Sequence, residues 1–138
     1  MLDNGTNRIT WLLALTEQLS AEQANAIFSR IAASGSTEII PYLRLGDFAL
    51  RRKDMAQAEV WVRQAEKLQP KQPAVLLALG KLALARGEFD NGVRLLEEAK
   101  DRGESSANLY SALGVGYNRL KRWEKNLQVN FLKKITKA

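Results

Sequence analysis

The dipeptide Leu-Gly occurs three times in this chain, and the same interval separates successive copies. The copies are Leu45-Gly46, Leu79-Gly80 and Leu113-Gly114. A period of about 34 residues, with Leu-Gly in the first half of each unit and small residues in the second half, is typical of stacked helix-turn-helix repeats. A single unit of this kind cannot bury its own apolar face, so neighbouring units must stack. The sequence therefore predicts an all-α repeat array.

Within each unit, apolar and small residues recur in steps of three and four, which places them on one stripe of a helix. A Gly inside a helix costs about 1 kcal/mol relative to Ala, so three Gly in register indicate close crossings of paired helices. Pro70 lacks an amide hydrogen and is expected to end the second helix of the first unit. The first unit supplies Tyr42, Leu45, Gly46, Ala49, Ala58, Val62 and Ala65, and the second supplies Leu76, Leu79, Gly80, Ala83, Gly92, Leu96 and Ala99.

These residues resemble the tetratricopeptide repeat family from Ile39 to Ala138. The turn of the family motif is matched by Gly87 and Phe89, and Trp123 stands one repeat period after Phe89. The resemblance implies a right-handed superhelix, an α-solenoid of antiparallel helix pairs. Its three units would be residues 39–72, 73–106 and 107–138.

The sequence departs from the family pattern at three places. Lys53 and Met55 occupy the turn of the first unit, and Glu104 replaces the closing Pro of the second unit. These departures leave the helical periodicity intact. The match is therefore specific for a fold and unspecific for a function, because the family is a general protein-binding scaffold.

Residues 1–38 are predicted to form a diverged helical hairpin that covers the open end of the first unit. Its helices would be Arg8 to Leu19 and Ala21 to Ser34. Ser20 and Gln23 fit a capping box, in which each side chain accepts a backbone amide of the other residue.

The composition gives little support to catalysis. The chain has no His and no Cys, so the commonest general base, the usual activated thiol and thiolate metal ligands are all absent. Glu97 and Glu98 could be a catalytic pair of carboxylates, but neighbours on a helix point about 100° apart and do not converge on one substrate atom. We therefore expect no catalytic residue, no bound metal and no cofactor.

The family resemblance implies a concave groove lined by the first helix of each unit. The lining would be mainly aliphatic with isolated charges, which suits an apolar or amphipathic segment of a partner protein. The alternative is that the Leu side chains only bury themselves against adjacent repeats. The positions carried over are Ile40, Leu43, Asp47, Leu50, Arg51, Leu77, Lys81, Leu84, Asn108, Ser111, Val115, Asn118 and Arg119.

One family function is disfavoured at the same positions. Co-chaperone members hold a terminal carboxylate with Lys, Asn and Arg, whereas the corresponding places here include Leu43, Asp47, Ala78, Ser111 and Val115. Asp47 would repel an acidic chain end. A carboxylate clamp is therefore not encoded.

The C-terminal segment from Arg119 to Ala138 carries the whole excess of positive charge in the chain. Its single acidic residue is Glu124, so its net charge equals the +6 of the entire protein. Such a segment would suit an accessory module that binds nucleic acid or an anionic membrane. The other interpretation is that these charges favour the helix dipole and keep a terminal repeat soluble. The basic residues are Arg119, Lys121, Arg122, Lys125, Lys133, Lys134 and Lys137.

A separate last helix is expected from Glu124 to Lys137, where the repeat pattern and the apolar pattern disagree. The packing places of the family hold Asn126, Asn130 and Lys133, whereas the apolar residues form a different stripe. We expect this helix to rotate and pack on the third unit, leaving partly exposed residues for self-association. The residues involved are Leu127, Phe131, Leu132 and Ile135.

Together these features predict a non-catalytic scaffold that holds a peptide or helix of a partner protein during assembly of a larger complex. The repeat style resembles that of bacterial envelope and secretion factors. No apolar run approaches the roughly 20 residues that span a bilayer, and the run Trp11 to Leu15 is too short for a signal peptide. Cytoplasmic and periplasmic locations both remain open, and any segment for export or anchoring would lie outside this chain.

Overall fold

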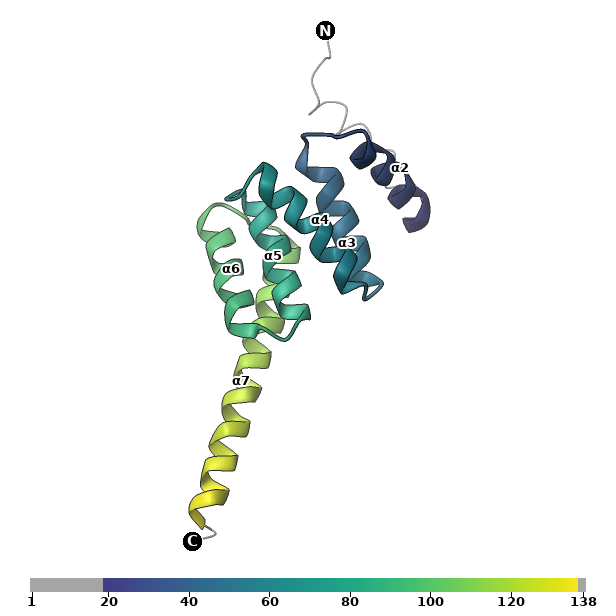
Figure 1. Cartoon of the computed structure of the whole chain (residues 1–138). Coiled ribbons are helices and arrows are strands. Elements are labelled where there is room, and N and C mark those ends of the chain that lie inside the picture. The colour runs from purple at the N-terminus through teal and green to yellow at the C-terminus, as the bar shows by residue number, and fades with distance from the viewer. Residues whose placement is uncertain (1–18, 137–138) are drawn as a thin grey trace.

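The structure is a computed structural model that describes residues 19–136, apart from the side chains of residues 123–127, 129–131 and 136. All regular secondary structure in this part of the chain is α-helical, and neighbouring helices are packed as pairs (Figure 1). The helices are α2 (Ala21–Ala33), α3 (Ile39–Arg51), α4 (Met55–Leu68), α5 (Pro73–Ala85), α6 (Phe89–Asp101) and α7 (Ala107–Thr136).

Helix α2 begins at the predicted capping box. The Gln23 amide donates to the Ser20 hydroxyl at 3.2 Å, and the Ser20 amide donates to the Gln23 side-chain oxygen at 3.0 Å. The helix packs on α3 and buries Phe28. The predicted capping box and a helix that begins at Ala21 are therefore confirmed. The helix predicted from Arg8 falls almost entirely outside the described residues.

The helices after α2 form two hairpins, α3 with α4 and α5 with α6, and the first helices of successive hairpins also pack side by side. In both hairpins the helices approach closely at the predicted Gly positions. A Cβ atom placed on Gly46 would lie 2.9 Å from Cγ2 of Val62, and one placed on Gly80 would lie 2.7 Å from Cγ of Leu96. The two Gly residues therefore allow contacts that any larger residue would disturb.

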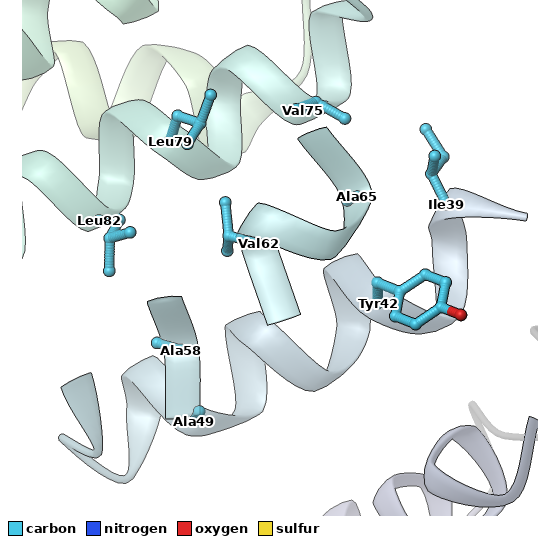
Figure 2. Close-up of a cluster of buried hydrophobic side chains, with 9 residues drawn as sticks. All are labelled: Ile39, Tyr42, Ala49, Ala58, Val62, Ala65, Val75, Leu79 and Leu82. Carbon is cyan, nitrogen blue, oxygen red and sulfur yellow. The ribbon is translucent and has the colours of Figure 1, made fainter. Parts of the chain in front are cut away.

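The core between the two hairpins is built from small and aliphatic side chains (Figure 2). Ala58, Val62 and Ala65 of α4 lie between the side chains of α3 and those of α5, and each is at most 1% exposed. Tyr42 contributes its ring to this core and donates its hydroxyl to the Ser36 carbonyl at 2.8 Å. One core thus joins α3, α4 and α5, and a second core joins α5, α6 and α7, so consecutive units are packed together as the repeat pattern predicted.

The turns inside the two hairpins have the same backbone form. Lys53 has a φ of 60°, and Gly87, at the equivalent position of the next unit, has a φ of 83°. This left-handed conformation suits Gly and is unfavourable for Lys, whose Cβ approaches the following carbonyl. The departure of the first unit from the repeat motif therefore introduces strain without changing the turn.

Helix α7 differs from the prediction. It is a single helix of 30 residues, and the expected break before Glu124 is absent. Its first half packs on α6 and α5, whereas its second half extends away from the other helices (Figure 1). The prediction of a separate last helix that folds back on the third unit is therefore wrong. The third unit has a first helix and no second helix packed against it within the described residues.

None of the helices in the described residues combines the length and the apolar character that crossing a membrane requires.

Candidate peptide-binding pocket

A pocket opens between the first helices of the two hairpins, and we refer to it as the α3–α5 pocket. Its volume is about 210 Å³. Helix α3 supplies one wall, α5 supplies the other, and α4 and the start of α7 contribute one residue each. The lining residues are Leu43, Arg44, Asp47, Leu50, Val62, Ala74, Leu77, Ala78, Lys81 and Asn108.

The aliphatic walls of the pocket come from residues with two roles. Leu43 and Leu50 pack against the core between the hairpins, and Leu77 packs against the core between α5, α6 and α7. All three are only half-buried and also face the pocket. Each of these leucines therefore packs against a core with part of its side chain and lines the pocket with another part.

The polar part of the pocket is an ion pair between residues at the same position of successive units. Nζ of Lys81 lies 2.7 Å from Oδ1 of Asp47, and the two side chains are only 30% and 28% exposed. Arg51 approaches the other carboxylate oxygen at 3.0 Å. Asp47 therefore has two cations beside it, and its negative charge is offset within the protein.

These polar groups keep hydrogen-bonding capacity that a ligand would use. The Lys81 ammonium has three donors, and its contact with Asp47 uses one of them. Each oxygen of Asp47 has one cation beside it and keeps a second lone pair. They lie within an apolar surround, where hydrogen bonds are stronger than in water. The pair can thus offer a donor and an acceptor to the backbone of a bound peptide.

Several residues predicted for the groove lie elsewhere. Leu84 contacts the positions where a Cβ on Gly92 or Gly116 would stand, so it fills the space between α5, α6 and α7. Ile40 is half-buried against the core, whereas Arg51 reaches Asp47 from outside the pocket. The remaining positions are exposed on α7 and do not line the pocket: Ser111, Val115, Asn118 and Arg119.

Arg44, Val62, Ala74 and Ala78 line the pocket although they are not among the groove positions carried over from the family. The repeat period contained a signal for one of them, because Ala74 stands one period after Ile40 and one period before Asn108. Ile40 and Asn108 are both predicted groove positions. A small residue at an expected lining position deepens the pocket, and this consequence depends on the neighbouring helix as well as on the residue itself.

The surface formed by α4, the linker after it and α6 has a different character, because salt bridges dominate it. Glu59 of α4 pairs with Arg86 at the end of α5. Glu98 of α6 lies 3.4 Å from Lys71 and 3.3 Å from Arg102. Desolvation raises the pKa of Glu98, but the two cations outweigh it and leave the pKa below its ordinary value. This charged surface contrasts with the apolar pocket.

A second hollow of about 380 Å³ lies between the turn before α6 and Leu120 of α7. Among the described residues its polar side chains are those of Glu88, Asp90 and Asn91, and none of the described lining residues is basic. Among the described residues no group of three or more His, Cys, Asp and Glu side chains is placed to hold a metal ion.

Those residues predicted for charge and self-association that the structure describes lie on α7 from residue 119 onward. Arg119, Lys121, Arg122, Lys133 and Lys134 are exposed, as are Leu132 and Ile135. The side chains of Lys125, Leu127 and Phe131 are outside the described part of the structure, and so is Lys137.

In comparisons with known proteins, no family model matches the chain and no curated protein matches it.

Proposed function

We propose that this chain is a non-catalytic protein-binding module whose helix pairs are tetratricopeptide repeats arranged as a right-handed superhelix. Its α3–α5 pocket would take an aliphatic side chain from a partner protein. The observation that carries this proposal is a pocket with aliphatic walls and the ion pair of Asp47 with Lys81 at its side. By analogy with the family, such binding would serve the assembly of a larger complex, including bacterial envelope or secretion complexes.

The size of the pocket favours a side chain over a small molecule. Binding sites for drug-sized ligands usually measure about 300–1,000 Å³, and a cavity of about 150 Å³ suffices for a benzene ring. A pocket of about 210 Å³ therefore accepts one large aliphatic or aromatic group. Such a group would displace water from the surfaces of Leu43, Leu50 and Leu77, and this apolar burial drives the binding.

The ion pair would supply orientation. An extended peptide, or the end of a helix, presents free backbone amides and carbonyls beside its anchoring side chain. Asp47 would accept from an amide, and Lys81 would donate to a carbonyl. A partner with an acidic residue next to its aliphatic anchor would also approach Lys81 and Arg44 favourably.

Selection from a displayed library of random peptides would test this proposal. The selected peptides should share one aliphatic or aromatic anchor, and the consensus peptide should bind the wild-type chain in a fluorescence anisotropy titration. Lys81→Glu places a second carboxylate beside Asp47 and should weaken binding at least tenfold. Leu77→Asp should abolish binding while circular dichroism still reports a helical protein.

Leu68→Asp is the matched control, because Leu68 is an exposed leucine at the end of α4 and does not line the pocket. This variant should bind the consensus peptide with unchanged affinity. If no peptide is enriched, or if Lys81→Glu binds as tightly as the wild type, the pocket is not the binding site and the proposal fails.

The alternative, binding of nucleic acid or an anionic membrane through α7, has less support. At about 100° per residue, Arg119, Lys121 and Arg122 lie within about 160° of one another around the helix. Lys134 lies outside this arc, so the exposed cations are spread over about 220° of the helix. A nucleic-acid site usually gathers its cations on one face. A gel shift or liposome sedimentation that is strong at low salt and collapses steeply with added salt would favour this alternative.

A further inference from the structure

One face of α7 is exposed although the equivalent faces of α3 and α5 are buried. In α3 this face contains Tyr42, Gly46 and Ala49, and in α5 it contains Leu76, Gly80 and Ala83. The residues one period after the α5 set are Tyr110, Gly114 and Tyr117 of α7. Tyr42 is 8% exposed and Leu76 is 2% exposed, whereas Tyr110 is 51% and Tyr117 is 47% exposed.

The space beside Gly46, Gly80 and Gly114 also differs between the three helices. A Cβ on Gly46 would meet the side chain of Val62, and a Cβ on Gly80 would meet Leu96. A Cβ on Gly114 would meet nothing within 4 Å. A terminal repeat normally ends in a polar surface. Helix α7 instead exposes two aromatic residues on either side of a Gly, and no helix of the described residues covers them.

The chain's own C-terminal segment is poorly suited to cover this face in the manner of the earlier hairpins. The crossing positions on the second helices are Ala58 with Val62, and Gly92 with Leu96; one period later the sequence has Asn126 and Asn130. A hairpin in the same register would bury two side-chain amides against Gly114, which is unfavourable without partners for them. This accounts for the continuation of α7 as one straight helix.

The same face continues along α7 as a heptad stripe. Beginning at Tyr110, its positions are separated alternately by four and three residues up to Ile135, a distance of about 38 Å along the helix. A mean spacing of about 3.5 residues is that of a coiled-coil contact. We call this stripe the α7 seam, and it consists of Tyr110, Gly114, Tyr117, Lys121, Glu124, Gln128, Phe131 and Ile135.

The α7 seam is complementary to itself when two copies run antiparallel about a two-fold axis between Arg122 and Trp123. This register brings Lys121 opposite the partner's Glu124, so opposite charges meet at the centre. Gly114 comes opposite the partner's Phe131, a large residue against a vacant position. Apolar residues meet at both ends, where Tyr110 lies opposite the partner's Ile135.

We propose that a second copy of this chain covers the exposed face of α7, and that the two α7 helices form an antiparallel pair along the seam. Each helix then takes the place that α4 has against Gly46 and α6 has against Gly80, so each copy completes the last unit of the other. The interface is isologous, as in most two-fold dimers. It lies on a different face from the α3–α5 pocket and does not depend on the function proposed for that pocket.

The charge of α7 gives the dimer a distinctive response to salt. Exposed cations outside the seam, such as Arg119, Arg122 and Lys134, repel their counterparts in the second copy. Added salt screens this repulsion. Dimerisation should therefore be maintained or strengthened between low and high salt, in contrast to binding of nucleic acid, which salt weakens.

Cysteine cross-linking tests the antiparallel register directly, because the natural chain contains no Cys. Tyr110→Cys and Ile135→Cys are made as separate full-length variants and oxidised alone and as an equimolar mixture. In the proposed pair, position 110 faces position 135 of the other copy. The mixture should therefore yield a covalent dimer, and each variant alone should remain largely monomeric on a non-reducing gel.

The wild type should show twice its 15.4 kDa mass in light scattering at high protein concentration. Efficient cross-linking of either single variant alone would indicate parallel helices and overturn the proposal. A wild type that stays monomeric up to millimolar concentration would also overturn it, and would leave a helix of another protein as the occupant of this face.

Two further variants separate dimerisation from folding. Gly114→Gln adds a side chain into open space in one copy, so it should preserve helicity, but it should abolish the dimer by displacing the partner's Phe131. Val115→Gln is the matched control, since Val115 is exposed and lies about 100° away around the helix. If Gly114→Gln dimerises as well as Val115→Gln, the seam is not the interface.

Charge exchange at the centre gives an independent readout. Lys121→Glu and Glu124→Lys should each weaken the homodimer at least tenfold, because each places like charges opposite one another. Combining both changes in one chain restores the opposite charges and should restore dimerisation. Failure of the double variant to recover would overturn the proposed register.

Discussion

Two of the repeat glycines should respond differently to the same substitution. Gly80 and Gly114 occupy the same position in successive units, but within the described residues only Gly80 has a second helix packed against it. A Cβ on Gly80 would lie 2.7 Å from Cγ and Cδ2 of Leu96 and 3.2 Å from the carbonyl oxygen of Gly92. Leu96 is fully buried and cannot withdraw. Gly80→Ala must therefore push α5 and α6 apart.

The expected magnitudes follow from two contributions. Replacing Gly by Ala within a helix stabilises it by about 1 kcal/mol, and this gain applies at both positions. Overpacking a close contact costs about 1–3 kcal/mol, and this cost applies at Gly80 alone. Gly114→Ala should thus be more stable than the wild type by about 1 kcal/mol. Gly80→Ala should be less stable than Gly114→Ala by about 1–3 kcal/mol, a difference in which helix propensity cancels.

Urea unfolding followed by circular dichroism measures this difference. The experiment is run on dilute protein so that any association through α7 contributes little. Because the two variants share the same chemical change, their unfolding midpoints can be compared directly, provided that their m-values agree. Equal stabilities for Gly80→Ala and Gly114→Ala would refute the reasoning, because they would mean that α6 does not pack closely on Gly80.

Three smaller changes test other parts of the structure. Gly46→Ala should fall between the two variants above, because a Cβ there would meet only Cγ2 of Val62 within 3.0 Å; a stability outside that interval would contradict the packing at α3. Lys53→Gly should stabilise the chain by about 1 kcal/mol by relieving the left-handed backbone, and a lower thermal midpoint would contradict this. Glu98 should hold its proton less tightly than an ordinary Glu, so its contacts stabilise the fold above pH 4.5 and lose that effect as the pH falls through the lowered pKa. Lys71→Ala should raise the pKa of Glu98 toward 4.5, and an NMR titration that shows no rise would exclude Lys71 as the cause.

The parts of the fold that could be predicted from sequence are those set by local periodicity. Steps of three and four residues identified the buried stripes of α3 to α6, and Gly46 and Gly80 lie at the close crossings that their register predicted. Ser20 and Gln23 marked the start of α2 because a capping box involves only residues within one turn. Local periodicity predicts the pocket less well than the helices. Its shape depends on how far apart α3 and α5 lie, and side chains such as Leu84 turned to the core instead of the pocket.

The end of the array shows why a repeat period cannot by itself predict a turn. Lys53 and Gly87 end their helices because the left-handed residue is followed by a new helix that buries small or aliphatic residues against the first. Position 121, the next in this series, is a Lys within α7, and the segment after it offers Asn126 and Asn130 at the crossing places. A turn there would cost backbone strain and would bury amides, whereas continuation of the helix costs neither. The polar residues that mismatched the repeat pattern were therefore evidence against a third hairpin. Continuation leaves Tyr110, Gly114 and Tyr117 with the composition of a buried face and no helix among the described residues of their own chain to bury them.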